Sequence, residues 1–410
     1  MIRFPAVLGL NRPRLSISKR IDQMSESTVK TSVILFGDRY MPPSAIAGQA
    51  KLIEASGVVD YLQISDQLVN FIPPQLWTVE NAPLSKVLPD LDSCPDAFAL
   101  ASYCLASTPK LGVTVATDSI RRGPAELIQT MLTMSNFTEG KAIFLIGGGE
   151  VKQAKPYGWK RSEGLSRMED LFRIFHALLD GNGPINFEGN HWKFQHAYLG
   201  GSKQHRPTLW GLGGGPKLVE LATTYCDGLV GTAPCGWATP DEAREHINDV
   251  KKMLVAKGRD PEMFSFGMFF PILLHEDPAI IDRALDNPII RWMAGTVGRI
   301  EPQDWLKEGM EPAVPDGWNY FLKMLPYDTS DEFIASVLSK TTRKMAEKGM
   351  FWGTPTQVAS IFQEYVDAGV NWVLPVDYMP LVLTPEDAAT SVNRSIEVCA
   401  HLKRINAPKK

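Results

Sequence analysis

The chain has 410 residues, of which 46 are acidic and 42 basic, so its formal net charge is −4. Hydrophobic residues make up 44% of the chain and charged residues 21%, as in ordinary soluble globular proteins. This balance argues against a nucleic-acid-binding surface, which needs a basic patch. No apolar run approaches the roughly 20 residues that a membrane helix needs.

The cysteines, the histidines and one missing motif argue against disulfides, a metal site and a serine nucleophile. The five cysteines are widely spread and form no Cys-x-x-Cys pair, so we interpret them as reduced, mostly buried thiols of a cytoplasmic protein. The seven histidines show no metal-ligand spacing, and we predict no metal site. A Gly-x-Ser-x-Gly nucleophile elbow is also absent from the sequence.

The N-terminal segment differs in composition from the rest. Residues 1–23 carry five basic residues and no acid before Asp22. We predict a disordered extension over residues 1–30; a presequence-like segment and a translation start at Met24 are the alternatives. The folded part is predicted as a single domain over residues 31–410.

From Thr31 onward, strand-like and helix-like segments alternate. In the first half we predict strands over 32–37, 58–65, 110–117 and 141–149, helices over 44–56, 96–107, 124–136 and 165–180, and a hairpin over 185–194. A long loop rich in proline and aromatic residues separates the second strand from the second helix.

In the second half of the chain, strands and helices continue to alternate, and one insertion interrupts them. We predict strands over 208–213, 228–231, 264–274 and 371–375, and helices over 216–226, 240–257, from Thr354-Pro355 to Gly369, and over 383–402. An irregular insertion rich in Trp, Pro and Gly is predicted over 287–349. About eight strand–helix units favour a (β/α)8 TIM barrel; a doubly wound open sheet is the runner-up.

Two glycine runs mark the ends of predicted strands. Gly147–Gly149 closes the buried strand KAIFLIGGGE, and Glu150 follows it directly. Glycine allows close backbone approach to a ligand, and a carboxylate at such a rim can act as a general acid or base. The alternative is a surface acid at the start of a loop.

The second run, Gly213–Gly215, lies between a strand and a helix that begins at Pro216. Bare amides at a helix N-terminus offer donors to an anion, so a phosphate site is predicted here. The alternative is a tight turn. Glycine and polar residues recur after several strands, and barrel enzymes assemble their sites from such strand ends.

Five segments in this order resemble the bacterial luciferase-like superfamily, in particular its deazaflavin (F420)-dependent oxidoreductases such as the phthiodiolone-type ketoreductases and glucose-6-phosphate dehydrogenases. They are DYLQISDQL, GVTVATDSIRRGPAELIQTMLTM, EGKAIFLIGGGE, WGLGGGPKLVELATTYCDGLVGT and GTPTQVASIFQEYVDAGVNWVLPV. The resemblance runs from about Ser32 to Leu402, and it implies a luciferase-like TIM barrel.

The resemblance also implies catalytic roles. Asp66 falls in the motif that contacts the deazaflavin region, and Glu150 matches an acid that donates or accepts a proton. Asp38 lies where the family often keeps a pocket carboxylate. The family places a histidine after the motif aspartate, whereas this chain has Gln67, which cannot exchange a proton at neutral pH.

Cofactor contacts are implied at four strand ends. Thr114-Val115 matches a position that often has a non-proline cis peptide behind the ring, and Thr117 follows on the ring side. Phosphate-binding loops are implied at Gly213-Gly214 and Gly231-Thr232. Gly147, Gly148 and Gly149 complete the predicted cofactor edge.

The function expected from these features is F420-dependent hydride transfer to or from a ketone, alcohol or activated double bond of a small or hydrophobic substrate. Aromatic residues of the long loop and of the insertion suit a hydrophobic pocket, although packing of the insertion on the barrel explains them equally well. The alternatives are an FMN-dependent monooxygenase and a non-catalytic cofactor-binding protein. The resemblance further implies a homodimer.

Overall fold

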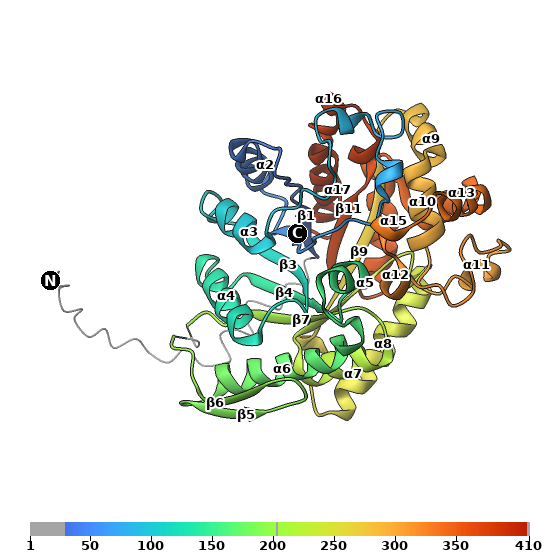
Figure 1. Cartoon of the computed structure of the whole chain (residues 1–410). Helices are drawn as coiled ribbons and strands as arrows, with labels where there is room; N and C mark the ends of the chain where they lie inside the picture. The colour runs from blue at the N-terminus through green and yellow to red at the C-terminus, as the bar shows by residue number, and fades with distance from the viewer. Residues whose placement is uncertain (1–28, 202–203, 408–410) are drawn as a thin grey trace.

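A closed ring of parallel strands forms the centre of the molecule (Figure 1). The computed structural model describes residues 29–201 and 204–407. The ring runs β1–β2–β3–β4–β7–β8–β9–β11 and returns from β11 to β1. Its strands are β1 Lys30–Ile34, β2 Tyr61–Ser65, β3 Gly112–Asp118, β4 Ala142–Gly147, β7 Thr208–Leu212, β8 Gly228–Thr232, β9 Ser265–Leu274 and β11 Trp372–Asp377. The predicted (β/α)8 TIM barrel is therefore confirmed.

Helices surround the ring, as Figure 1 shows. They are α2 Pro43–Ala55, α3 Ala97–Leu105, α4 Pro124–Phe137, α6 Gly164–Asp180, α7 Pro216–Tyr225, α8 Pro240–Ala256, α9 Pro278–Asp286, α15 Pro355–Asp367 and α17 Ser391–Ile405. Many begin with proline, whose fixed φ suits the first helical turn. Capping boxes at Thr239–Glu242 and Thr354–Gln357 fix the starts of α8 and α15.

Alternation along each strand divides the core into two layers. The barrel interior is filled by Ile143, Leu145, Trp210, Val230, Trp372 and Leu374. Intervening residues such as Val113, Val115 and Phe144 pack outward against the helices. Since successive side chains of a strand point to opposite faces, this division shows which residues at each strand end face the mouth of the barrel.

Residues 287–349 contain five α-helices joined by irregular stretches, so the prediction of an irregular insertion was only partly right. The helices are α10 Pro288–Val297, α11 Asp304–Lys307, α12 Tyr320–Lys323, α13 Asp331–Lys340 and α14 Arg343–Gly349. Frequent Pro and Gly keep several of them short, which hid their periodicity. They pack around a core of their own that contains Trp292 and Trp305, both almost fully buried.

Several predicted boundaries moved. β1 ends at Ile34, earlier than predicted, and β10 Phe351–Gly353, which pairs with β9, was missed. The predicted hairpin is present as β5 Ile185–Glu188 and β6 Lys193–Ala197. The predicted closing helix over 383–402 is divided into α16 Pro385–Ala388 and α17, and the 3-10 helix η7 Met379–Val382 precedes it. The long loop contains η1 Pro74–Leu76 and η2 Pro83–Lys86.

Most of the predicted N-terminal extension over residues 1–30 lies outside the described residues. Within the part of the chain that the structure describes, no helix is long and apolar enough to cross a membrane. The five cysteines are unpaired, and four of them are buried.

Candidate functional site

Asp66, directly after β2, is held in a buried ion-pair network. Its carboxylate accepts a hydrogen bond from the Thr117 hydroxyl at 2.7 Å and lies 3.1 Å from a guanidinium nitrogen of Arg121. The side chains of Asp66 and Arg121 are only 5% and 7% exposed. Because Ile64 and Val115 face the outer helices, Asp66 and Thr117 face the same outer layer. Their role as cofactor ligands stays a prediction.

Asp118 completes this network at the end of β3. It accepts hydrogen bonds from the amides of Ile120 and Arg121 and from the Arg121 guanidinium. The sequence analysis missed both charged residues, although the Asp-x-x-Arg spacing of TDSIRR is a usable signal for a local ion pair. Arg121 thus binds two carboxylates from two adjacent strand ends.

Gln67 follows Asp66, two residues beyond the end of β2. Its side chain is partly buried. An amide there can donate a hydrogen bond but cannot serve as the acid.

Glu150 stands at the end of β4 and is paired with a buried lysine. The Lys152 ammonium lies 2.9 Å from its carboxylate, donates to the Val69 carbonyl at 2.7 Å and sits 3.9 Å above the centre of the Phe71 ring. The side chain of Lys152 is 1% exposed, whereas that of Glu150 is 21% exposed. The sequence analysis missed Lys152, because a lysine on a short helix is usually exposed.

Lys152 lies on the short helix α5, Val151–Ala154. The next residue of this helix, Gln153, connects the loop after β4 to the loop after β2. The Gln153 side chain accepts from the Leu68 amide at 2.7 Å and donates to the Val69 carbonyl at 2.7 Å. The hydrogen bonds of Gln153 therefore hold the loop after β2 without any contribution from Lys152. The charge of Lys152 forms the ion pair with Glu150.

The helical segment 287–349 reaches this site. Helix α12 packs against α5, and the two lie side by side in Figure 1. Burial raises the pKa of Tyr320 on α12 and of Tyr378 after β11, and the charge of Glu150 adds to both increases. Both phenols are therefore neutral at pH 7, and Tyr320 shares a side-chain hydrogen bond with Cys235.

A cavity of about 660 Å³ opens beside Lys152. It lies between the loops that follow β1, β2 and β4 and the segment 287–349, and its lining includes Arg39, Leu68, Asp92, Lys152, Tyr157 and Tyr327. Its volume falls within the roughly 300–1,000 Å³ of small-molecule sites. Trp292 and Trp305, two of the aromatic residues considered for a pocket, instead pack inside the segment.

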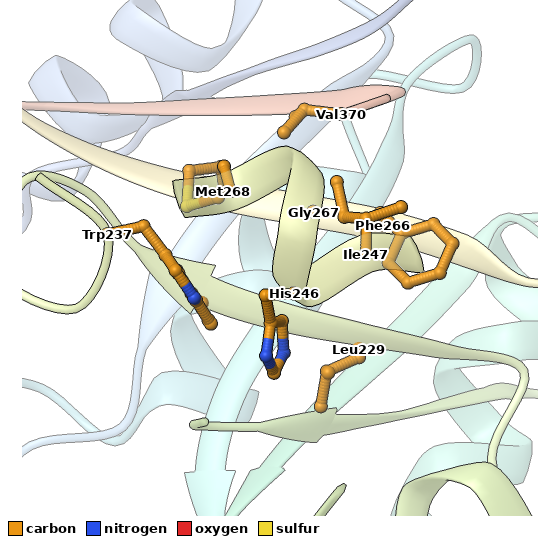
Figure 2. Close-up of a pocket in the computed structure, with 10 residues that line it drawn as sticks. Leu229, Trp237, His246, Ile247, Phe266, Gly267, Met268 and Val370 are labelled. Atoms are coloured by element: carbon orange, nitrogen blue, oxygen red, sulfur yellow. The ribbon is translucent and has the colours of Figure 1, made fainter. Parts of the chain in front are cut away.

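The glycine edges differ in what surrounds them. A Cβ atom on Gly231 would lie 1.5 Å from the indole of Trp237, and one on Gly214 would lie 3.2 Å from it. Figure 2 shows this indole beside His246, with ring centres 4.6 Å apart, at a small cavity of about 10 Å³. Gly231 therefore makes room for Trp237; phosphate binding by Gly231 and Thr232 stays a prediction.

One expectation from the resemblance needs correction. Thr114 and Val115 lie in a regular parallel ladder with β2 and β4, and among residues 29–201 and 204–407 the one cis bond is Ala233–Pro234. The expected cis peptide is therefore absent from β3.

Asp38 lies four residues beyond β1. Its carboxylate accepts from the amides of Tyr40 and Met41 at 2.7 and 2.9 Å. These bonds give Asp38 a clear role in stabilising a turn; a part in catalysis is not tested by them.

No group of three or more His, Cys, Asp or Glu side chains suited to a metal ion occurs among the described residues. The site at the mouth of the barrel consists instead of an acid with a buried cation, two phenols, bare glycine amides and an adjacent cavity. Such a set is suited to binding an organic molecule and moving a proton.

Comparison with known proteins places the chain in a family. Residues 21–371 match the model of the luciferase-like monooxygenase family, and the chain belongs to that family. It is 23% identical over 373 residues to a phthiodiolone/phenolphthiodiolone dimycocerosates ketoreductase of Mycobacterium tuberculosis, covering 89% of this chain and 96% of the relative.

Two further relatives carry F420 in their names. An F420-dependent glucose-6-phosphate dehydrogenase of Kineococcus radiotolerans is 24% identical over 280 residues, which is 67% of this chain and 74% of the relative. The structure of an F420-dependent secondary alcohol dehydrogenase with an F420–acetone adduct is 18% identical, with a TM-score of 0.68 over 92% of this chain and 99% of the other. The chain is an enzyme of the oxidoreductase class.

Proposed function

We propose that this enzyme is an F420-dependent oxidoreductase that moves a hydride to or from a ketone, an alcohol or an activated double bond of a small or hydrophobic substrate. The ion pair of Glu150 and Lys152 beside the 660 Å³ cavity carries the proposal. The names of the ketoreductase, dehydrogenase and alcohol dehydrogenase relatives support the choice of cofactor and reaction.

The residues at the mouth of the barrel fit a cofactor with a flat ring and an anionic tail. The cavity has the size of a ligand site, and Lys152, five residues after the end of β4, lines it. Bound at the mouth of the barrel, F420 supplies or accepts the hydride. The residues proposed to hold it are Thr114, Gly147, Gly148, Gly149, Gly213, Gly214, Gly231 and Thr232. Asp66, Val115 and Thr117, which face the outer layer, are proposed to support the site from behind.

Hydride transfer at a carbinol carbon requires a matching proton transfer at its oxygen. Gln67 cannot exchange that proton, so the proposal assigns the step to Glu150. In alcohol oxidation its carboxylate accepts the hydroxyl proton; in ketone reduction it returns one. Lys152 holds the carboxylate in place at 2.9 Å.

Fluorescence titration of the purified protein with F420 and, separately, with FMN tests the cofactor. Tight binding of F420 with weak binding of FMN is expected. A preference for FMN would instead direct the work to oxygen-dependent assays, and binding of neither would contradict the proposal.

Turnover needs its own test, because Gln67 leaves open a protein that binds the cofactor without reacting. Ketones and secondary alcohols should be screened for a change in the absorbance of bound F420. Binding without any turnover would support the non-catalytic alternative.

The proposed homodimer, formed through outer helices, is tested independently by light scattering. A mass of twice 45.4 kDa is expected. A monomer would remove the dimer without affecting the proposed reaction.

A further inference from the structure

The 660 Å³ cavity beside Lys152 is lined by none of the residues proposed above to hold the cofactor. Its walls come from the loops after β1, β2 and β4 and from the 3-10 helix η6, Pro326–Asp328, of the segment 287–349. A space of this size, next to the ion pair proposed for proton transfer and apart from the cofactor residues, is suited to the substrate. The chemistry of its walls therefore indicates which substrates fit.

The charges at the buried end of the cavity are already engaged. Lys152 is almost fully buried and forms the ion pair with Glu150. Asp92 accepts a hydrogen bond from the hydroxyl of Tyr327. A substrate group that reaches this end meets an acid paired with a cation, and no unpaired charge.

Apolar side chains form much of the wall of the cavity. They belong to three separate parts of the chain and are Leu68, Val69, Pro156, Leu325 and Pro326. These side chains offer contacts to hydrocarbon and no hydrogen bonds, so the body of the substrate is predicted to be apolar.

Two cations on the exposed side of the cavity have no acidic partner. Arg39, after β1, and Lys155, after α5, both line the cavity, and neither forms an ion pair with an acid within residues 29–201 and 204–407. The Arg39 guanidinium donates one hydrogen bond to the Cys94 carbonyl at 2.7 Å, which leaves most of its donors available. Asp328 is the acid of the lining that opposes these two cations. The unpaired charge of the lining is therefore positive and suits an anionic group.

We propose that the substrate is a carboxylic acid with an apolar chain that carries the reacting ketone or alcohol. The reacting oxygen lies toward Glu150, and the carboxylate binds Arg39 and Lys155. This inference rests on the proposed function for the reaction itself. The carboxylate does not react, so Arg39 and Lys155 determine specificity for acids over neutral analogues.

Calorimetric titration of the full-length protein with octanoate and with octanamide, with and without F420, tests the site. The two probes have the same chain length, and only octanoate is charged. Because exposed ion pairs are individually weak, two of them should make octanoate bind about tenfold more tightly than octanamide. Added salt should reduce this preference, since it screens exposed charges.

Substitution of the charges should act on octanoate alone. Arg39→Gln and Lys155→Gln should each weaken octanoate binding about threefold, and the double variant about tenfold. Octanamide should bind within about twofold throughout, which also shows that the cavity remains folded. Asp328→Asn removes the opposing charge and should strengthen octanoate binding about twofold. Lys160→Gln is the matched control, because Lys160 is 77% exposed and lies outside the lining; it should change neither affinity.

Three outcomes would overturn the inference. They are equal affinities for the two probes in the unmodified protein, equal weakening of both probes in the double variant, and binding of neither probe. Turnover gives a separate measurement. With F420, a medium-chain oxo acid should have a lower KM than its methyl ester at a similar kcat, and the double variant should remove that difference.

A failure of the proposed function is distinguishable from a failure of this inference. Selective binding of octanoate by a protein that does not bind F420 would leave the acid site in place and remove the cofactor assignment. Reduction of neutral ketones as efficiently as of oxo acids would leave the reaction in place and overturn the assignment of Arg39 and Lys155.

Discussion

Two carboxylates at neighbouring strand ends have opposite surroundings. Asp66, after β2, is 5% exposed and is bound by Thr117 and Arg121 on the outer side of the sheet. Glu150, after β4, is 21% exposed and is paired with one buried cation, Lys152. Lys152 in turn lines the cavity. An acid held by several buried donors is suited to fixing the scaffold, whereas a more exposed acid with one partner is suited to proton transfer.

The largest effect is expected for substitution of Glu150, the acid proposed for proton transfer. Glu150→Gln keeps the shape of the side chain but removes its ability to exchange a proton. It should lower kcat about 100-fold or more, with the Kd for F420 within a few-fold. The measurement is steady-state turnover of a substrate found in the screen, together with a cofactor titration.

Glu163→Gln serves as the control for Glu150→Gln. Glu163 is a neighbouring acid, 26% exposed and paired with Arg167, and its substitution should leave kcat nearly unchanged. An unchanged rate in Glu150→Gln would remove Glu150 from proton transfer.

The next largest effect is a loss of stability on substitution of Asp66, the buried acid. Asp66→Asn leaves the buried Arg121 with a weaker partner, and breaking a buried ion pair costs about 3–5 kcal/mol. Because Asp118 also binds Arg121, we expect the lower end, about 3 kcal/mol, as a fall in the free energy of unfolding measured with urea. A variant of normal stability that had lost F420 affinity would instead make Asp66 a cofactor ligand.

The sequence predicted the barrel well because strands and helices of ordinary length carry strong local signals. Gly147–Gly149 and Pro216 marked real strand and helix ends. The short helices of the insertion were not predicted because they are stabilised by a shared core around Trp292 and Trp305, which no local pattern reveals.

The partners of the site residues were beyond sequence reasoning for a similar reason. Glu150 was predicted at the rim, but its pairing with Lys152 depends on burial between the loops after β2 and β4. The use of Gly231 to accommodate Trp237 likewise appears only in the folded packing. A sequence shows which residue types are present for chemistry. The pairing of their charges depends on the fold.

A third carboxylate extends the comparison. Asp377, at the end of β11, is 2% exposed, and its Oδ1 accepts from the Met379 amide at 3.0 Å. Its Oδ2 has no partner among the described residues, and Arg394, the cation that acts on it, is paired with Glu276 at 3.0 Å. Burial therefore raises the pKa of Asp377 to about 7.

This pKa sets the sign of a small stability effect. An unfolded aspartate has a pKa of about 3.9, so between pH 4 and pH 7 the folded protein holds the proton that the unfolded chain releases. The contribution of Asp377 is fully present below about pH 4 and is lost as the pH rises toward 7. Between pH 5 and pH 7 the loss should reach about 2 kcal/mol.

Asp377→Asn removes the titrating group, so its free energy of unfolding should depend less on pH than that of the unmodified protein by this amount. Urea unfolding at pH 5, 6 and 7 measures both proteins, and the difference between them cancels the other titrating groups. Parallel curves would mean that Asp377 is ionised throughout and is compensated by Arg394. It would then belong with Asp66, as a carboxylate held by a cation, and the contrast between paired and unpaired acids would be confined to the mouth of the barrel.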